Sequence, residues 1–303
     1  MGKQTEIEWC DATWNPWYGC RKVSAGCKFC YAEREMTRYG RDFGAVTRAK
    51  DATFRAPLKW KEPKRIFTCS WSDWFIKEAD PWRAEAWNII ERPPQHTYLI
   101  LTKRVERIMS PNANHRLPWA PWEKPWPNVW LGVSVENQEQ ADKRIPILLQ
   151  IPAALHFVSY EPALGPIDLR SYLAIERLGD LAIEKSPDHK ITRSLNWVIV
   201  GGESGRTARP FEVGWAFDVL DQCKAAGVPC FVKQMGSRVR VSQETLNRRF
   251  GGTMSFNTYD QVAEQFVITL DHNKGADMSE WPGALRVREW PKAEEVGSRE
   301  TEN

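Results

Sequence analysis

Three cysteines close together near the start of the chain are the residues best suited to chemistry. Cys20, Cys27 and Cys30 follow the spacing C-x6-C-x2-C. Three thiolates on one short loop form a site for a soft metal centre, either zinc or an iron–sulfur cluster. A four-iron cluster held by three cysteines keeps one iron open to a ligand other than protein, whereas a structural zinc ion is closed by four protein ligands. The loop therefore indicates either an enzyme or a zinc-stapled binding module.

The zinc interpretation needs a fourth ligand from elsewhere in the chain. Cys10, Cys69 or one of the five histidines can supply it. The iron–sulfur interpretation needs no further protein ligand. Two details favour it: Phe29 lies between the last two cysteines, and the loop follows a candidate strand at 12–17 and precedes a helical pattern that starts at Ala32.

Other polar side chains stand where short apolar segments end. Six β-rich segments run directly into polar residues, and their near-continuous apolar character is typical of strands buried on both faces. The segments are 66–69, 97–101, 129–133, 155–158, 197–200 and 230–232, and the ionisable residues that follow them are Asp73, Lys103, Glu136, Glu161, Glu203 and Lys233.

Helical patterns alternate with these segments, at 81–90, 137–149 and 213–226. Such alternation predicts an α/β fold with a parallel sheet and right-handed crossovers, a partial or complete (β/α) barrel. Because barrels of this kind place their chemistry at the carboxyl ends of the strands, we expect the polar residues to converge on one mouth.

The expected core spans residues 1–236, with an insertion near 171–194. A small C-terminal extension follows over 237–303 and ends in a charged tail. The chain has 42% hydrophobic and 27% charged residues, lacks an apolar run long enough to cross a membrane and shows no N-terminal signal pattern. We therefore expect a cytoplasmic protein whose cysteines stay reduced.

The arrangement Cys-x-aromatic-Cys-Tyr-Ala after a first strand resembles the radical S-adenosylmethionine (SAM) superfamily, in which the first cysteine gap is commonly three residues shorter. Over most of its length the chain also resembles a divergent, phage-associated family with a three-cysteine motif. Seven motifs carry this second likeness, and they begin at Thr13, Ser70, Leu101, Leu131, Ser159, Gly201 and Phe231.

The resemblance implies a [4Fe-4S] cluster on Cys20, Cys27 and Cys30, with SAM on the open iron and an electron donor such as flavodoxin or ferredoxin. One-electron cleavage of SAM then yields methionine and a 5′-deoxyadenosyl radical that abstracts hydrogen from the substrate. By position, the implied SAM-binding residues are Phe29, Ser70, Ser72, Asp73, Lys103, Arg104, Ser134, Glu136 and Asn137. The residues implied to face substrate, as catalytic candidates, are Glu161, Glu203, Lys233 and Gln234.

The phage association points to DNA or a nucleoside as substrate. Basic stretches at 48–50, 59–65 and 238–249 are suited to phosphates, and the aromatic residues Trp119, Trp122 and Trp126 are suited to an unstacked base. The leading hypothesis is hypermodification of an amino-acid-modified thymidine in phage DNA. Repair similar to that of spore photoproduct lyase, a zinc-stapled nucleic-acid-binding module without catalysis, and a peptide or small-molecule substrate are the alternatives.

Overall fold

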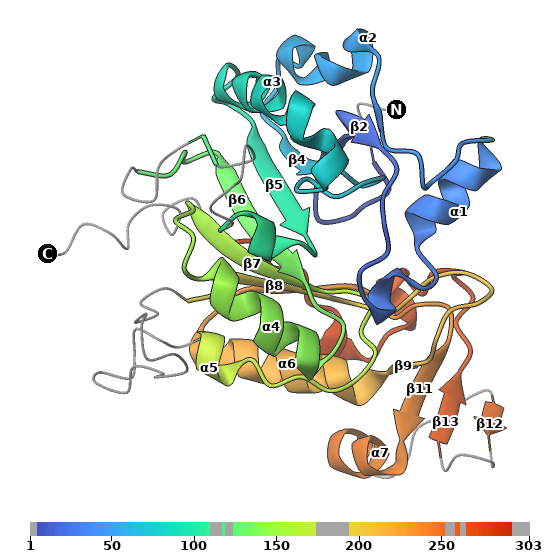
Figure 1. The fold of residues 1–303 in the computed structure, drawn as a ribbon. Helices are drawn as coiled ribbons and strands as arrows, with labels where there is room; N and C mark the ends of the chain where they lie inside the picture. Colours follow the sequence, from blue (N-terminus) through green and yellow to red (C-terminus); the bar gives the residue numbers. More distant parts are fainter. Residues whose placement is uncertain are drawn as a thin grey trace, which may run out of the picture.

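The computed structural model describes residues 5–109, 117–118, 124–173, 194–251, 258–260 and 265–292. At its centre lies a seven-stranded sheet in which every neighbouring pair runs parallel, in the order β1-β4-β5-β6-β7-β8-β10. The sheet curls into a half-barrel (Figure 1), which confirms the expected partial α/β barrel. Its strands are β1 (Ala12–Trp14), β4 (Arg65–Thr68), β5 (Thr97–Thr102), β6 (Val129–Ser134), β7 (Leu155–Tyr160), β8 (Trp197–Gly201) and β10 (Cys230–Gln234).

The three helices expected from the apolar periodicity are present, each within one residue of its predicted ends. The side chain of Asn137 begins α4 by accepting a hydrogen bond from the Gln140 N–H at 3.0 Å, and Gly227, at φ 66°, ends α6 in the left-handed conformation that glycine favours. The helices are α1 (Tyr31–Arg38), α2 (Asp51–Phe54), α3 (Asp80–Glu91), α4 (Gln138–Leu148), α5 (Arg170–Leu173), α6 (Val213–Ala226) and α7 (Gln243–Phe250).

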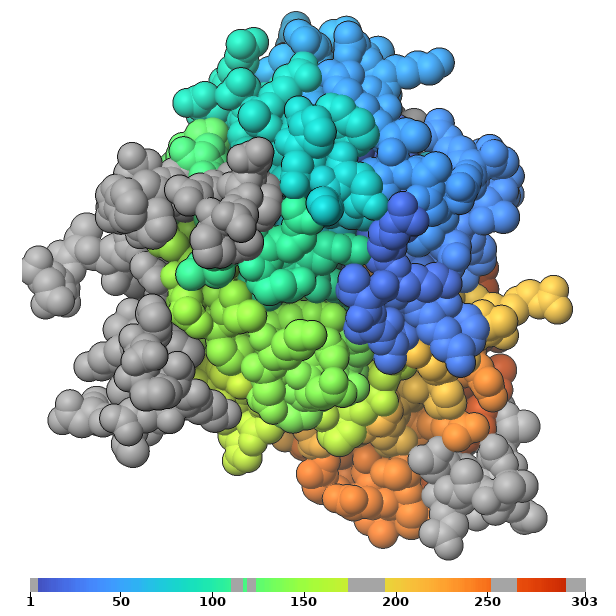
Figure 2. All heavy atoms as spheres, in the orientation of Figure 1, coloured from blue at the N-terminus to red at the C-terminus, as the bar shows by residue number. Residues whose placement is uncertain are grey.

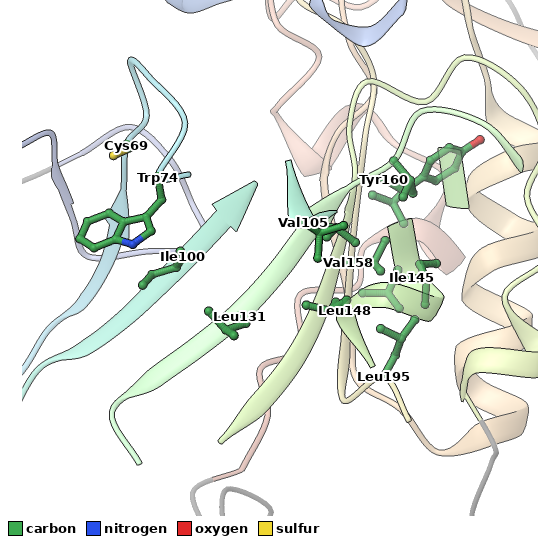
Figure 3. Close-up of a cluster of buried hydrophobic side chains, with 14 of the residues drawn as sticks. Cys69, Trp74, Ile100, Val105, Leu131, Ile145, Leu148, Val158, Tyr160 and Leu195 are labelled. Carbon is green, nitrogen blue, oxygen red and sulfur yellow. The ribbon is translucent and has the colours of Figure 1, made fainter. Parts of the chain in front are cut away.

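One apolar cluster, the outer cluster, lies between the sheet and its helices. Ile100, Leu131 and Val158 of three neighbouring strands belong to it, together with Ile145 and Leu148 of α4, and Figure 3 shows these two helical side chains beside the strands. All five are at most 1% exposed. This packing fixes the helices on the convex face of the half-barrel.

A second apolar cluster, the inner cluster, fills the other face of the sheet and is rich in aromatic rings. Trp9 lies at its centre, with ring centroids 4.6 Å from Phe67 and 6.2 Å from Trp197. Phe157 and Phe231 complete the same cluster. Because these residues come from the strands and from the segment before β1, the concave face is filled by side chains toward the amino ends of the strands.

The predicted first strand, 12–17, is wrong in one respect, because β1 ends at Trp14 and a second strand begins at Trp17. The second, β2 (Trp17–Tyr18), leaves the main sheet and pairs antiparallel with β3 (Thr47–Arg48). Between them the side chain of Asn15 accepts a hydrogen bond from the Trp71 N–H at 2.8 Å, and Pro16 has no N–H to offer a neighbouring strand. The chain therefore turns out of the sheet just before the cysteines.

The chain after residue 237 forms the expected small C-terminal element. A second sheet joins β9 (Phe211–Glu212), β11 (Val239–Ser242), β13 (Gln265–Ile268) and β12 (Thr258–Asp260), and it lies with α7 at one end of the molecule (Figure 1). The chain then returns to the main sheet: the Val232 N–H donates to the Val287 carbonyl at 2.9 Å, and the Glu289 N–H donates to the Cys230 carbonyl at 3.0 Å. These contacts cover the outer edge of β10.

Several expected features lie outside the described residues. They are most of the predicted insertion, at 174–193, the charged tail after Lys292, and the aromatic residues Trp119 and Trp122. Within the described part of the connection from β5 to β6, the only helical element is a 3-10 turn, Val105–Arg107. No helix in the described ranges is long and apolar enough to cross a membrane.

Candidate metal and cofactor site

The cysteine loop, residues 19–30, joins β2 to α1 across the carboxyl ends of the main strands. Figure 1 shows its dark-blue turn beside the arrowheads of the sheet, and Figure 2 shows the dark-blue residues on the surface, bordered by green and by yellow to orange residues. Cys20, Cys27 and Cys30 are each partly buried, and none of them forms a disulfide.

The ends of β4 and β5 hold the first half of the cysteine loop. The Ser72 hydroxyl donates to the Gly19 carbonyl at 2.5 Å. The guanidinium of Arg104 donates through Nη2 to the Arg21 carbonyl at 2.6 Å, and its Nη1 lies 3.6 Å from the Cys20 sulfur. Two residues that we expected to bind SAM thus contact the loop that carries the cysteines.

Asp73 orients this arginine. Its Oδ2 lies 3.0 Å from Nη1 of Arg104 and accepts from the Lys103 N–H at 2.9 Å, while its Oδ1 accepts from the Thr102 hydroxyl at 2.7 Å and from the Phe75 N–H at 2.9 Å. The side chains of Asp73 and Arg104 are 7% and 8% exposed. A buried carboxylate with this many donors is fully satisfied by the protein.

The same surroundings act on the first cysteine. Burial raises the pKa of the Cys20 thiol to about 12, the nearby Asp73 carboxylate adds to the rise, and the Arg104 guanidinium opposes it. Since metals bind the thiolate, loading a metal onto Cys20 would release a proton.

Glu136, just beyond the end of β6, contacts the second half of the loop at Gly26. It is 0% exposed, its Oε1 accepts from the Gly26 N–H at 3.0 Å, and its Oε2 lies 3.0 Å from Nη1 of Arg144. A Cβ atom on Gly26 would lie 3.1 Å from the Glu136 carboxyl carbon, so glycine permits this close approach. Burial favours the protonated acid, but the hydrogen bonds it accepts and the charge of Arg144 outweigh burial and lower the pKa of Glu136.

Glu203, just beyond β8, reaches the loop through an arginine that the sequence motifs did not single out. Arg209 donates through Nη2 to Oε1 of Glu203 at 2.7 Å and through Nε to Oε2 at 2.9 Å. Its Nη1 donates to the Ala25 carbonyl at 2.9 Å, and its guanidinium carbon lies 5.3 Å from the centroid of the Phe29 ring. Residues that follow β4, β5, β6 and β8 therefore all contact the cysteine loop, as expected for parallel strands that end at one mouth.

A separate ion pair lies on the inner face of the sheet. Side chains alternate along a strand, so Glu161 continues the face of Phe157, and Lys233 continues the face of Phe231. Their Oε1 and Nζ atoms lie 3.0 Å apart, and the side chains are 15% and 18% exposed. A Cβ atom on Gly201 would lie 2.4 Å from the same Oε1 atom, so the carboxylate depends on this glycine for space. Burial lowers the pKa of Lys233, but the Glu161 charge outweighs burial and raises it overall.

Most of the remaining predicted residues serve local structure. Ser70 accepts from the Asn15 side chain at 2.9 Å, and Gln234 donates to the Gly202 carbonyl at 2.8 Å. Ser134 is buried at the end of β6. Lys103 is partly exposed, and within the described part of the chain its ammonium group has no ion-pair partner.

The donor set of the cysteine loop fits a soft metal centre. Among the described residues no three histidine, cysteine or acidic side chains are arranged as a formed metal site. The loop nevertheless offers three free thiols, each partly accessible. Cys10 and Cys69, the proposed fourth zinc ligands, are buried in the inner and the outer cluster respectively. The thiolates of Cys20, Cys27 and Cys30 are the kind of ligand that zinc and iron–sulfur centres favour.

Many of the basic residues expected to meet phosphates are paired within the protein. Four arginines each have an acidic partner within 4 Å. Arg48 pairs with Asp51 and Glu85, and Arg65 pairs with Asp11. Arg248 pairs with Asp218, and Arg249 pairs with Asp218 and Asp221. Lys59 and Lys61 are exposed. Trp126 is partly buried and packs edge-on against Trp87, at a centroid distance of 6.1 Å.

Comparison with known proteins gives one family and a set of distant structures. No curated protein matches the chain. Among solved structures it is similar to a spore photoproduct lyase mutant with bound AdoMet and dinucleoside spore photoproduct, at 10% identity and a TM-score of 0.39 over 86% of this chain and 68% of that chain. It is also similar to spore photoproduct lyase complexed with dinucleoside spore photoproduct, at 12% identity and a TM-score of 0.36 over 84% and 67% of the two chains. The model of the family described as protein of unknown function DUF5131 matches residues 4–263, and the chain belongs to that family.

Proposed function

We propose that this protein is a radical SAM enzyme whose [4Fe-4S] cluster is held by Cys20, Cys27 and Cys30. One observation carries the proposal: a loop with three free thiols follows the first strand of a parallel half-barrel and is held across the carboxyl ends of its strands. Three protein thiolates leave one iron open, which is the vacancy that SAM requires.

The residues of the chain have separate tasks in this proposal. When bound, the cluster and SAM would supply a 5′-deoxyadenosyl radical for hydrogen abstraction. Asp73, Arg104 and Glu136 keep the loop in place. Lys103 and the pair Glu161–Lys233 present the charges that would bind the charged ends of SAM and substrate. The inner cluster, which lies toward the amino ends of the same strands, excludes water from that side of these charged groups.

Anaerobic reconstitution tests the proposal. We expect about four iron and four sulfide per chain, visible absorbance, and slow conversion of SAM to 5′-deoxyadenosine and methionine under a chemical reductant. Replacing Cys20, Cys27 or Cys30 with alanine should abolish the absorbance. Cys223→Ala, at a buried thiol of α6, is the matched control and should retain it. One zinc ion per chain and no cleavage of SAM would instead support a zinc-stapled module.

We further propose that the substrate is a nucleic-acid base, and specifically an amino-acid-modified thymidine of phage DNA. Beside the cysteine loop, Tyr39 is 64% exposed and stacks on Trp71 at a centroid distance of 5.9 Å and an interplanar angle of 29°. Arg38 and Arg41 are exposed next to it. An exposed aromatic ring flanked by cations is the kind of surface on which single-stranded bases stack.

Tyr39→Ala should weaken binding of single-stranded DNA about 5- to 150-fold, since stacking contributes about 1–3 kcal/mol per base. Leu58→Ala, at another exposed apolar side chain, is the control and should bind DNA normally. Binding should also weaken steeply with salt.

An assay of nucleoside masses identifies the reaction. Reduced enzyme and SAM are incubated with modified, unmodified and ultraviolet-irradiated DNA, and the digested nucleosides are weighed. A mass change only in the modified thymidine supports hypermodification, whereas loss of a photoproduct supports repair. No mass change in any arm, with no DNA binding, would contradict a nucleic-acid substrate.

A further inference from the structure

The second half of the cysteine loop is held differently from the first half. Arg104 contacts the segment at Cys20 directly, but Cys27 and Cys30 receive no such contact from a strand-end residue among the described side chains. Their neighbours Ala25, Gly26 and Phe29 are contacted instead, and Tyr31, directly after Cys30, donates through its hydroxyl to the Ser70 carbonyl at 2.8 Å.

Arg209 joins the cysteine loop to a segment far along the chain. The Ala25 carbonyl to which it donates is 184 residues away in sequence. Its Nε, Nη2 and backbone N–H all donate to the carboxylate of Glu203, at 2.9, 2.7 and 2.9 Å. The pair is largely buried, with side-chain exposures of 23% for Arg209 and 7% for Glu203.

The segment between these two residues also contacts the helix that follows the cysteines. Arg34 of α1 donates to the Ser204 carbonyl at 3.2 Å. Gly205 lies here at φ 110°, a conformation that favours glycine, and a Cβ atom on it would lie 2.4 Å from Nη1 of Arg34 and would force that side chain to shift. Residues 203–209 therefore contact the chain on both sides of Cys27 and Cys30.

The geometry of the arginine side chain explains why lysine would not replace it. A planar guanidinium donates in two directions at once, here to both oxygens of Glu203 and to the Ala25 carbonyl. An ammonium group is a point charge and cannot keep this fork geometry.

We propose that Glu203 and Arg209 are positioning residues that fix the second half of the cysteine loop, and with it Cys27 and Cys30, against the end of β8. This inference rests on the proposed function for its link to a cluster. It also changes the expectation for Glu203, whose carboxylate is engaged by Arg209 and acts on the cysteines through the loop.

The test measures alkylation of each cysteine in the metal-free, full-length protein by iodoacetamide and peptide mass spectrometry. In Arg209→Ala the alkylation rates of Cys27 and Cys30 should rise about tenfold, which corresponds to about 1.4 kcal/mol of easier local opening. The rate of Cys20, which Arg104 contacts, should stay within about twofold, and buried Cys223 should stay protected.

Matched variants separate positioning from charge and from folding. Arg209→Lys keeps the charge but loses the fork, so it should behave like Arg209→Ala. Arg170→Ala is the control, because Arg170 pairs with Asp168 through the same Nε and Nη2 geometry at an exposed site, with 77% of the arginine side chain accessible. This control should change no alkylation rate.

Iron content after reconstitution gives a second readout. We expect iron affinity to fall about 10- to 100-fold in Arg209→Ala, as is typical when partners behind metal ligands are removed. Unchanged rates at Cys27 and Cys30 in both Arg209 variants would overturn the inference, as would an equal rise at every cysteine. If the wild-type protein holds no cluster but the alkylation pattern is as expected, the proposed function fails and the positioning role stands.

Discussion

Charged residues at the strand ends act mainly on the cysteine loop. Asp73 and Arg104 form one buried pair, and Glu136 and Arg144 form another, and each pair contacts the loop through a hydrogen bond. Such pairs contribute little net stability when compared with apolar residues, but breaking one leaves a buried charge without its partner. The sequence predicted charged residues at this mouth, and the structure shows that most of these residues form ion pairs within the protein.

Glu136→Gln tests this role at the scale of one residue. The substitution leaves the Arg144 charge buried without its partner, so the free energy of unfolding at pH 7 should fall by about 3–5 kcal/mol. The folded-state pKa of Glu136 is lowered from an ordinary 4.5, so its ionic stabilisation is complete above that value and is lost as the pH falls through the folded-state pKa. The gap between wild type and variant in urea unfolding should therefore shrink below about pH 4.5.

Glu139→Gln is the matched control, since Glu139 is exposed in the first turn of α4. Losing its interaction with the helix dipole should cost less than about 1 kcal/mol. A wild-type advantage over Glu136→Gln that stays constant down to pH 3 would show that the carboxylate charge is not the stabilising feature.

At the scale of elements, hydrogen bonds from the strand ends connect the cysteine loop to the main sheet. Four strand ends contribute, through Ser72, Arg104, Glu136 and Arg209. The sheet and helices beneath them are packed through the outer and inner clusters. This differs from small metal-dependent domains, in which binding the metal supplies the folding energy.

Metal removal should therefore leave the fold intact. After chelation we expect an unchanged far-ultraviolet circular dichroism spectrum and a single cooperative unfolding transition, with a lower midpoint only to the extent that metal binding stabilised the native state. Iron and zinc contents before and after treatment serve as the control. Loss of helical signal on chelation would show that the loop and its neighbours need the metal to fold.

At the scale of the whole molecule, the C-terminal chain completes the main sheet. Residues 287–289 pair with β10, Leu285 is 0% exposed, and the ring of Trp290 lies 4.8 Å from that of Phe231. A core that ended at residue 236 would leave the β10 edge and part of the inner cluster uncovered. The chains on the two sides of the predicted boundary at residue 236 thus share a sheet edge and part of a core, and β9 from before it joins the second sheet.

Truncation tests this dependence. A chain that ends at Pro282 should lose solubility or unfold at a clearly lower urea concentration, because an uncovered, apolar sheet edge promotes aggregation. A chain that ends at Lys292 keeps the contacts of residues 287–289 with β10 and is the control. Equal stability and solubility of the two truncated chains would mean that the core is independent of its C-terminal segment.

The sequence by itself determined the parallel half-barrel, its three longest helices and the position of the cysteine loop at the carboxyl ends of the strands. These features follow from local periodicity and from the geometry of parallel strands. The break at Asn15 was missed because it depends on a side-chain contact with Trp71, 56 residues away.

Only the tertiary structure decided which partner each polar residue takes. Gly26 meets Glu136 across 110 residues, and Arg209 meets Ala25 across 184. No local sequence pattern predicts such pairings, since they depend on how the strand ends converge and on where glycines leave space. For this reason the sequence predicted a charged mouth around three thiols, while the fold paired Asp73 with Arg104, Glu136 with Arg144, Glu203 with Arg209 and Glu161 with Lys233.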